Sequence, residues 1–135
     1  MSASKPEGFH TVTPYLKIRD AGTAIEFYKK AFGATELMRH ADPDGKVRHG
    51  EFKIGDSPLM ISDEFPEHSY MPSVQKAGGS PVSLFLYVDD VDAFATQAQA
   101  AGCELIMPVK DESYGRSGGL KDPFGLIWWI STAKG

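Results

Sequence analysis

The chain has 135 residues, of which 41% are hydrophobic and 24% are charged, and its formal net charge is −4 at pH 7. This is the composition of an ordinary soluble globular protein, and an acidic balance without a basic run argues against nucleic acid as a partner. No apolar run approaches the length of a membrane span, and the opening residues lack the apolar stretch of a signal peptide, so we expect a cytoplasmic protein without a membrane partner.

The first half of the chain is predicted to form a strand, a helix and three further strands. Thr11–Ile18 has the β-branched and aromatic content of a strand, and the apolar residues of Ala21–Phe32 fall on one helical face. We expect Asp20 to cap this helix and Gly33 to end it. The three further strands are expected at residues 35–40, 47–54 and 59–62.

The second half repeats this order roughly 70 residues later. A strand is predicted at residues 82–88 and a helix at 91–101, with Asp90 as the cap of the helix and Gly102 as its stop. Two open sheets built from such a repeat can pair into a cup that binds a small molecule. Further strands are expected near 104–109, 116–120 and 126–131, and the turn-rich runs 112–119 and 122–125 are expected to line a rim.

The repeat predicts one domain over residues 1–135 that contains two modules. Module one covers about residues 9–63 and module two about residues 81–132. Residues 64–80 contain prolines and a Gly-Gly pair but no sustained period, and we interpret them as a linker. Cys103, the single cysteine, follows a helix stop and opens a strand, where a thiol usually packs as a small apolar group.

Because side chains alternate along a strand, each predicted strand has an apolar face that packs under the helices and an opposite face, called here the open face. Trp128 and Trp129 are adjacent, so Trp128 is expected in the core and Trp129 on the open face. Aromatic rings mixed with a few charged groups are typical of a ligand cavity, although an exposed sheet or a dimer interface has the same pattern. The other residues assigned to the open face are Thr13, Tyr15, Lys17, His49, Glu51, Lys53, Met60, Ser62, Ser83, Phe85 and Tyr87.

From residue 11 to 132 the chain resembles the glyoxalase, bleomycin-resistance and extradiol-dioxygenase superfamily, also called vicinal oxygen chelate proteins, and within it the PhnB-like branch. The resemblance implies an α+β fold in which two βαβββ modules form a cup-shaped sheet, and it implies a homodimer. The residues that carry the likeness are Thr13–Leu16, Ala24–Tyr28, Ala31–Ala34, Asp44–Lys46, His49, Ile54–Ser57, Met60–Glu64, Tyr87–Asp92, Asp122–Gly125 and Trp128.

The same resemblance implies four positions for metal ligands, one on each of four strands, where enzymes of this superfamily place His, Gln or Glu. In this chain the four positions hold Thr13, Met60, Ser83 and Trp129. Hydroxyl and thioether groups are poor ligands for hard or borderline cations, and an indole does not ligate. We therefore expect no metal at the inherited site and no cofactor.

Glu51 is the open-face carboxylate for which several roles remain. The favoured interpretation pairs it with Lys17 or Lys53, so that the ionised carboxylate orients a polar ligand. Alternatively, Glu51 acts as a general base, or joins His10 and His49 in a metal site that is noncanonical for the family. Arg116, at the expected rim, is able to meet an anionic ligand, although an ordinary solvated loop fits this residue equally well.

The function predicted from these features is metal-free binding of a small organic molecule, with sequestration of a toxic or antibiotic compound as in bleomycin-resistance relatives. The alternative is a lyase, isomerase or dioxygenase of the vicinal oxygen chelate type that uses the noncanonical metal site or Glu51. A third possibility is an interaction module without a ligand. The predicted ligand contacts are Tyr15, Lys17, His49, Glu51, Met60, Phe85, Tyr87 and Trp129.

Overall fold

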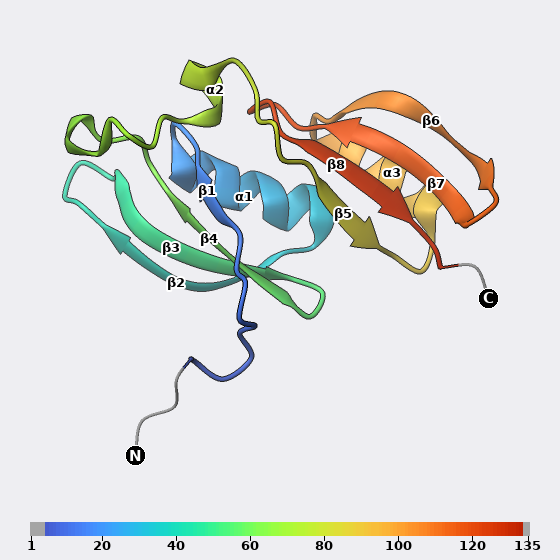
Figure 1. The fold of residues 1–135 in the computed structure, drawn as a ribbon, viewed down its shortest axis with the longest axis horizontal. Helices are drawn as coiled ribbons and strands as arrows, with labels where there is room; N and C mark the ends of the chain where they lie inside the picture. The colour runs from blue at the N-terminus through green and yellow to red at the C-terminus, as the bar shows by residue number, and fades with distance from the viewer. Residues whose placement is uncertain (1–4, 134–135) are drawn as a thin grey trace. The chain divides into compact units, whose positions relative to one another are not determined.

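The computed structural model describes residues 5–133, and the chain divides into two compact units. Unit one comprises residues 1–29 and 33–73, and unit two comprises residues 30–32 and 74–135. Each unit carries one four-stranded sheet, and along the chain a helix follows the first strand of each sheet and precedes the other three (Figure 1). The α+β fold class is therefore confirmed. Within the described range, no helix is both long and apolar enough to cross a membrane.

The sheet of unit one has the strand order β1-β4-β3-β2, in which β1 and β4 are parallel and the other neighbours antiparallel. The segment predicted as a linker contains two short helices, η1 (Pro66–His68) and α2 (Val74–Ala77). The other elements of the first half are β1 (Tyr15–Lys17), α1 (Ala21–Phe32), β2 (Thr35–Ala41), β3 (Val47–Ile54) and β4 (Ser57–Ser62).

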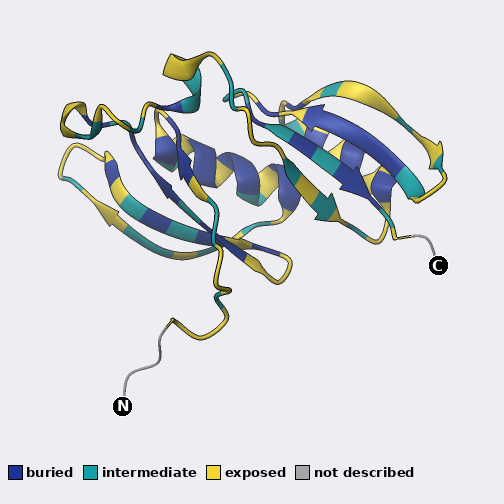
Figure 2. Ribbon diagram, viewed as in Figure 1, coloured by how far each residue is buried: buried dark blue, intermediate teal, exposed yellow. Residues whose placement is uncertain are grey.

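Helix α1 packs closely on β3 because Gly50 has no side chain. A Cβ atom at Gly50 would lie 3.3 Å from Ile25 Cδ1 and 3.1 Å from Ile61 Cγ2. One helical turn further on, the rings of Tyr28 and Phe52 stack with their centroids 5.3 Å apart. All of these side chains are buried, and they form the core of unit one between α1 and one face of the sheet (Figure 2).

The sheet of unit two repeats this topology with the order β5-β8-β7-β6. Its helix α3 (Val91–Ala101) has the predicted bounds and a strand lies at the predicted 116–120, but residues 112–119 are not the turn-rich run that was also expected. They belong mainly to two paired strands, because Ser117, Gly118 and Gly119 are buried strand residues rather than turn residues. The strands are β5 (Leu84–Tyr87), β6 (Glu104–Glu112), β7 (Gly115–Lys121) and β8 (Ile127–Ser131).

Trp128 lies at the centre of the core of unit two, as predicted, with 1% of its surface exposed. The ring of Phe32, from the last turn of α1, meets the indole edge-on at 4.9 Å. The indole N–H donates to Asp122 Oδ2 at 2.8 Å, so the one polar group of this side chain is satisfied. Cys103 is buried in the same unit, and burial raises the pKa of its thiol to about 12, which agrees with an apolar packing role.

Helices α1 and α3 start differently, although an aspartate precedes each of them. Asp90 caps α3 as predicted, because its carboxylate accepts a hydrogen bond from Ala93 N at 3.0 Å. The prediction was wrong for Asp20, which has a φ of 66° and makes no capping bond. The side chain of Asp63 takes its place and accepts hydrogen bonds from Asp20 N and Ala21 N at 2.7 and 3.2 Å.

Candidate ligand-binding site

Five of the predicted ligand contacts lie on the face of the unit one sheet that points away from α1. Tyr15 and Lys17 alternate with the buried Leu16, and His49 and Glu51 flank the buried Gly50. Met60 is the register partner of both Tyr15 and Glu51, so its strand lies between theirs. Because side chains alternate along a strand, all five share the open face, as predicted.

Three of these side chains form one continuous chain of hydrogen bonds. The Tyr15 phenol lies 2.7 Å from Nδ1 of His49, and Nε2 of the same imidazole lies 2.8 Å from Glu51 Oε2. The two rings are tilted by 51° with their centroids 5.4 Å apart. Tyr15 remains 40% exposed, while the Glu51 side chain is 19% exposed, so the chain runs from a partly buried carboxylate to an accessible phenol.

The predicted pairing of Glu51 with Lys17 or Lys53 was wrong, because the carboxylate is hydrogen-bonded to His49 instead. The ammonium group of Lys17 donates to Ser62 Oγ at 2.7 Å instead. Lys17 is only 7% exposed, and burial lowers the pKa of its ammonium group against the opposing charges of Asp63 and neighbouring glutamates. Lys17 therefore presents little of its charge to the open face.

The open face of unit two carries the three remaining predicted contacts. Phe85 and Trp129 are register partners on neighbouring strands, and the rings of Phe85 and Tyr87 lie 5.1 Å apart. Phe85 is 46% and Tyr87 73% exposed, which is unusual for two large aromatic residues on one strand. This face is therefore an aromatic surface, in contrast to the hydrogen-bonded chain of unit one.

Trp129 lies across Gly119, its neighbour on β7. A Cβ atom at Gly119 would come within 2.7 Å of Trp129 Cζ3 and 2.9 Å of Cε3, so only glycine leaves room for the indole in this position. The indole N–H donates to Ser83 Oγ at 3.0 Å. Glycine on one side and serine on the other thus fix the orientation of Trp129.

Three of the four side chains at the positions that the resemblance assigns to metal ligands are engaged in hydrogen bonds within their own unit. Ser83 and Trp129 are bonded to each other, and Thr13 Oγ1 donates to the carbonyl of His10 at 3.3 Å. Between residues 5 and 133, no three His, Cys, Asp or Glu side chains gather in a way that could hold a metal ion. The noncanonical set with His10 beside His49 and Glu51 is therefore not assembled.

A role for Arg116 in meeting a ligand requires a free guanidinium group. In the structure this group is paired with carboxylates instead. Its Nε and Nη2 atoms pair with the two carboxylate oxygens of Asp92 at 2.7 and 3.0 Å, and Nη1 lies 3.2 Å from Asp111. These two carboxylates raise the pKa of the guanidinium, with Asp92 the larger influence. Arg116 thus joins the start of α3 to the sheet.

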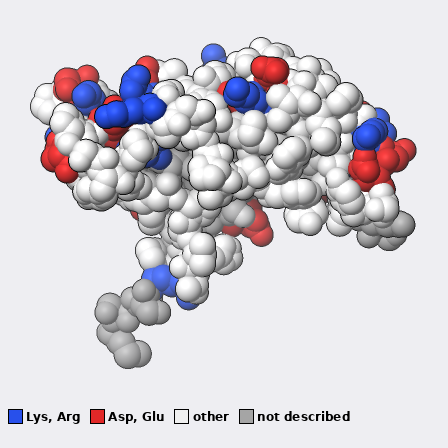
Figure 3. All heavy atoms as spheres, turned by 45° about the horizontal axis from the view of Figure 1, so that its top comes forward, with Lys and Arg blue, Asp and Glu red and all other residues white. Residues whose placement is uncertain are grey.

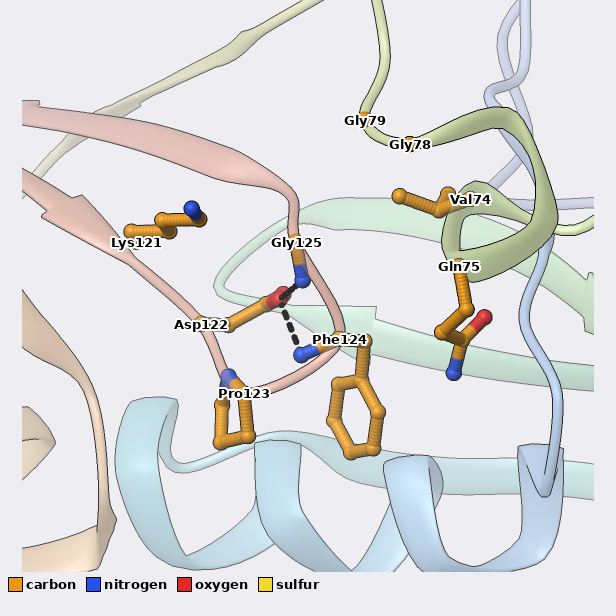
Figure 4. Close-up of a pocket in the computed structure, with 9 residues that line it drawn as sticks. All are labelled: Val74, Gln75, Gly78, Gly79, Lys121, Asp122, Pro123, Phe124 and Gly125. Carbon is orange, nitrogen blue, oxygen red and sulfur yellow. Dashed lines mark hydrogen bonds between the residues drawn. The ribbon is translucent and has the colours of Figure 1, made fainter.

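Unit two also contains an open cavity of about 290 Å³ that the sequence analysis did not predict (Figure 4). The Asp122 carboxylate at its edge accepts hydrogen bonds from the backbone of Phe124 and Gly125, both at 3.0 Å, and so holds the β7–β8 turn. None of the predicted ligand contacts lines it. The lining residues are Val74, Gln75, Gly78, Gly79, Lys121, Asp122, Pro123, Phe124 and Gly125.

Residues 9–130 match the family model described as the Glyoxalase/Bleomycin resistance protein/Dioxygenase superfamily, and the chain belongs to this superfamily. An uncharacterized protein of Mycobacterium bovis is 39% identical over 120 residues, which cover 87% of this chain and 79% of that protein. The sequence resemblance is thereby confirmed at the level of the superfamily.

Two solved structures illustrate the likeness in fold. TnmS3 from Streptomyces sp. CB03234, described as an antibiotic binding protein, is 25% identical, with a TM-score of 0.70 and coverage of 98% of this chain and 100% of its own. A PhnB protein from Bacillus cereus is 18% identical, with a TM-score of 0.70 and coverage of 92% and 100%. At that identity the second likeness shows the shared fold alone.

Proposed function

We propose that this protein binds a small organic molecule stoichiometrically on the open faces of its sheets, and so sequesters a toxic or antibiotic compound. The observation that carries the proposal is the chain from Glu51 through His49 to the accessible phenol of Tyr15. Three polar side chains held in series are costly to order on a bare surface, whereas they are pre-organised for a ligand's polar group. The printed description of TnmS3 as an antibiotic binding protein supports this class of ligand.

Unit two offers an apolar, aromatic face of its own. Trp129 is held by Ser83 and Gly119 in one orientation, and Phe85 lies beside it in the register. Rigid aromatic side chains lose little conformational entropy when a planar molecule stacks on them. We therefore propose that this face binds planar or aromatic molecules, and that the open face of unit one binds a polar group.

The proposed binding does not use a metal ion. The residues at the four family positions supply no carboxylate or imidazole, and Ser83 already accepts the hydrogen bond of Trp129. A hydroxyl and a thioether are too weak as ligands to replace the missing donors. The proposal thus rests on the chemistry of the side chains present at these positions.

Native mass spectrometry on protein purified without chelator tests this function. We expect retained organic mass at one ligand per chain, and its loss in the Tyr15→Phe, Glu51→Gln double variant. A Tyr70→Phe variant, whose ring lies outside both sheets, serves as the control. Protein that retains no organic mass and whose melting temperature no compound shifts would instead favour an interaction module. We also propose a homodimer, which a monomer mass in the same spectra would contradict.

An enzymatic function is the second candidate. A carboxylate hydrogen-bonded to an imidazole, which in turn is hydrogen-bonded to a phenol, is also suited to proton transfer. In that case Glu51 stabilises the protonated His49 while Tyr15 exchanges a proton with the substrate. Continuous turnover of a bound compound, lost in Glu51→Gln, would favour this candidate. Protection that saturates at one compound per chain would favour stoichiometric binding.

A further inference from the structure

We propose that Tyr15 meets the ligand as a hydrogen-bond acceptor, so that the site selects ligands with an O–H or N–H donor, such as a phenol, over ethers and carboxylates of the same shape. This inference rests on the proposed small-molecule binding and deepens it, because it names the polar group that the ligand must carry. The inference follows from the directions of the two hydrogen bonds that link Glu51, His49 and Tyr15. Each direction is determined by which of these side chains can donate and which can accept.

Glu51 determines the first direction. An ionised carboxylate has only acceptor sites, so the atom 2.8 Å from Glu51 Oε2 must carry a hydrogen. That atom is His49 Nε2, and a neutral imidazole carries only one N–H. The proton of the neutral His49 ring therefore resides on Nε2, and Nδ1 has a free lone pair.

His49 then determines the direction of the second bond. With its lone pair exposed, Nδ1 accepts, and the group 2.7 Å away, the Tyr15 phenol, has to donate its only hydrogen to it. The phenol oxygen is left with lone pairs and no hydrogen for a further partner. Because Tyr15 is 40% exposed, these lone pairs are available on the open face.

The surroundings of Tyr15 do not reverse this preference. The ammonium group of Lys17, two residues away on the same face, is buried and donates to Ser62. The negative charge of Glu51 stands behind His49, and the Tyr15 oxygen has no hydrogen left to donate, so an anionic group placed at Tyr15 gains no hydrogen bond from it. A neutral hydroxyl, a phenol or an amine is thus the group that this position accepts.

The first test is the tautomer of His49 at pH 8, where a free imidazole is neutral. Long-range proton–nitrogen NMR on the selectively labelled protein should show a protonated Nε2 and an unprotonated Nδ1. In Tyr15→Phe the Nδ1 resonance should move because it loses its donor, whereas Tyr70→Phe should leave it in place. A protonated Nδ1 in the wild-type protein would overturn the proposal.

The second test uses three naphthalenes of the same shape at pH 8: 2-naphthol, 2-methoxynaphthalene and 2-naphthoate. We expect 2-naphthol to bind the wild-type protein roughly tenfold more tightly than its methyl ether, the value of about one good hydrogen bond. The naphthoate should bind most weakly. Tyr15→Phe should abolish the difference between 2-naphthol and the ether, and Tyr70→Phe should keep it.

The outcomes separate this inference from the function on which it rests. If all three compounds bind with equal affinity, or if the naphthoate binds most tightly, the donor preference is overturned while small-molecule binding stands. If none of the three binds, both the inference and the proposed aromatic ligand are contradicted. Circular dichroism of each variant checks that Tyr15→Phe has not unfolded the protein.

Discussion

Asp63 is a buried carboxylate that holds three backbone segments of unit one together. Its Oδ1 atom accepts from Asp20 N and Ala21 N at the start of α1, and its Oδ2 atom accepts from Val47 N at the start of β3 at 2.7 Å. The residue is 5% exposed and follows directly on β4. It therefore fixes where the first helix begins relative to β3, the strand that carries both His49 and Glu51.

Replacing this carboxylate should destabilise the fold. Asp63→Asn keeps the shape but places an amide donor against backbone donors, and we expect the free energy of unfolding to fall by about 2 kcal/mol. Asp89→Asn, a change at an exposed residue, should alter it by less than about 0.5 kcal/mol. Urea denaturation of both variants measures the difference. Equal stability of the two would show that Asp63 does not secure the start of α1.

A side chain at Gly119 should also destabilise the fold, because the indole of Trp129 occupies the space that it would need. The added methyl of Gly119→Ala would meet the indole at 2.7 Å and the Met107 Cβ at 3.2 Å, and we expect a loss of about 2 kcal/mol together with altered tryptophan fluorescence. In a Trp129→Ala background the same substitution should cost less than half as much. An unchanged cost in that background would place the strain elsewhere.

At the scale of elements, the two helix starts give opposite predictions for the same residue type. Asp90→Ala removes a side-chain cap from α3 and should cost about 1 kcal/mol. Asp20→Gly removes no cap and relieves a residue held at a φ of 66°, so it should raise the free energy of unfolding by up to about 1 kcal/mol. Thermal and urea unfolding of the two variants test the pair. A loss of stability in Asp20→Gly would contradict the assignment of the cap to Asp63.

Helices α1 and α3 were predictable from the sequence, whereas the short helices η1 and α2 and the full length of β6 were not. Helices α1 and α3 have the expected bounds because a periodic apolar face and a terminal glycine define them locally. Strand β7 lies where a strand was expected near 116–120, but its glycines also made the run 112–119 look turn-rich, whereas the structure uses the small size of Gly118 and Gly119 against Val109 and Trp129. That requirement comes from neighbouring strands, which local composition does not report.

The candidate site was also predictable only in part. Alternation correctly placed Tyr15, His49 and Glu51 on one face, but their hydrogen bonds depend on strand order. Tyr15 reaches His49 across β4, and no spacing in the sequence encodes this approach. The pairing of Glu51 with lysine failed for a related reason, because Ser62, the register partner of Lys17, holds the ammonium group.

At the scale of the whole molecule, charged side chains are arranged as small mixed groups. On the face shown in Figure 3, basic and acidic atoms lie beside one another with broad uncharged areas between them. Hydrogen bonds from Lys29 and Arg39 lower the pKa values of Glu26 and Glu36, and Arg116 lowers the pKa of Asp92. The ionised carboxylates are therefore favoured in the folded chain relative to the unfolded one.

This arrangement predicts the sign of the acid response. The folded pKa values of these carboxyls lie below their unfolded values, so their stabilisation is complete above the unfolded pKa and is lost as the pH falls below about 4. Glu26 and Asp92 are exposed and Glu36 is half-buried, and the loss should be smaller in 1 M salt, which screens the ion pairs. Melting temperatures from pH 3 to pH 7 at two salt concentrations test this. A melting temperature that rises on acidification would contradict it.

The most direct test of the central claim is to map, by NMR on the labelled protein, where planar aromatic compounds with a hydroxyl group bind. The proposed function predicts that a bound compound perturbs the resonances of Tyr15 and His49 in unit one, and that Tyr15→Phe weakens its binding. Perturbations confined to the cavity around Gly79 and Phe124, or no binding by any compound, would contradict ligand recognition at the open faces.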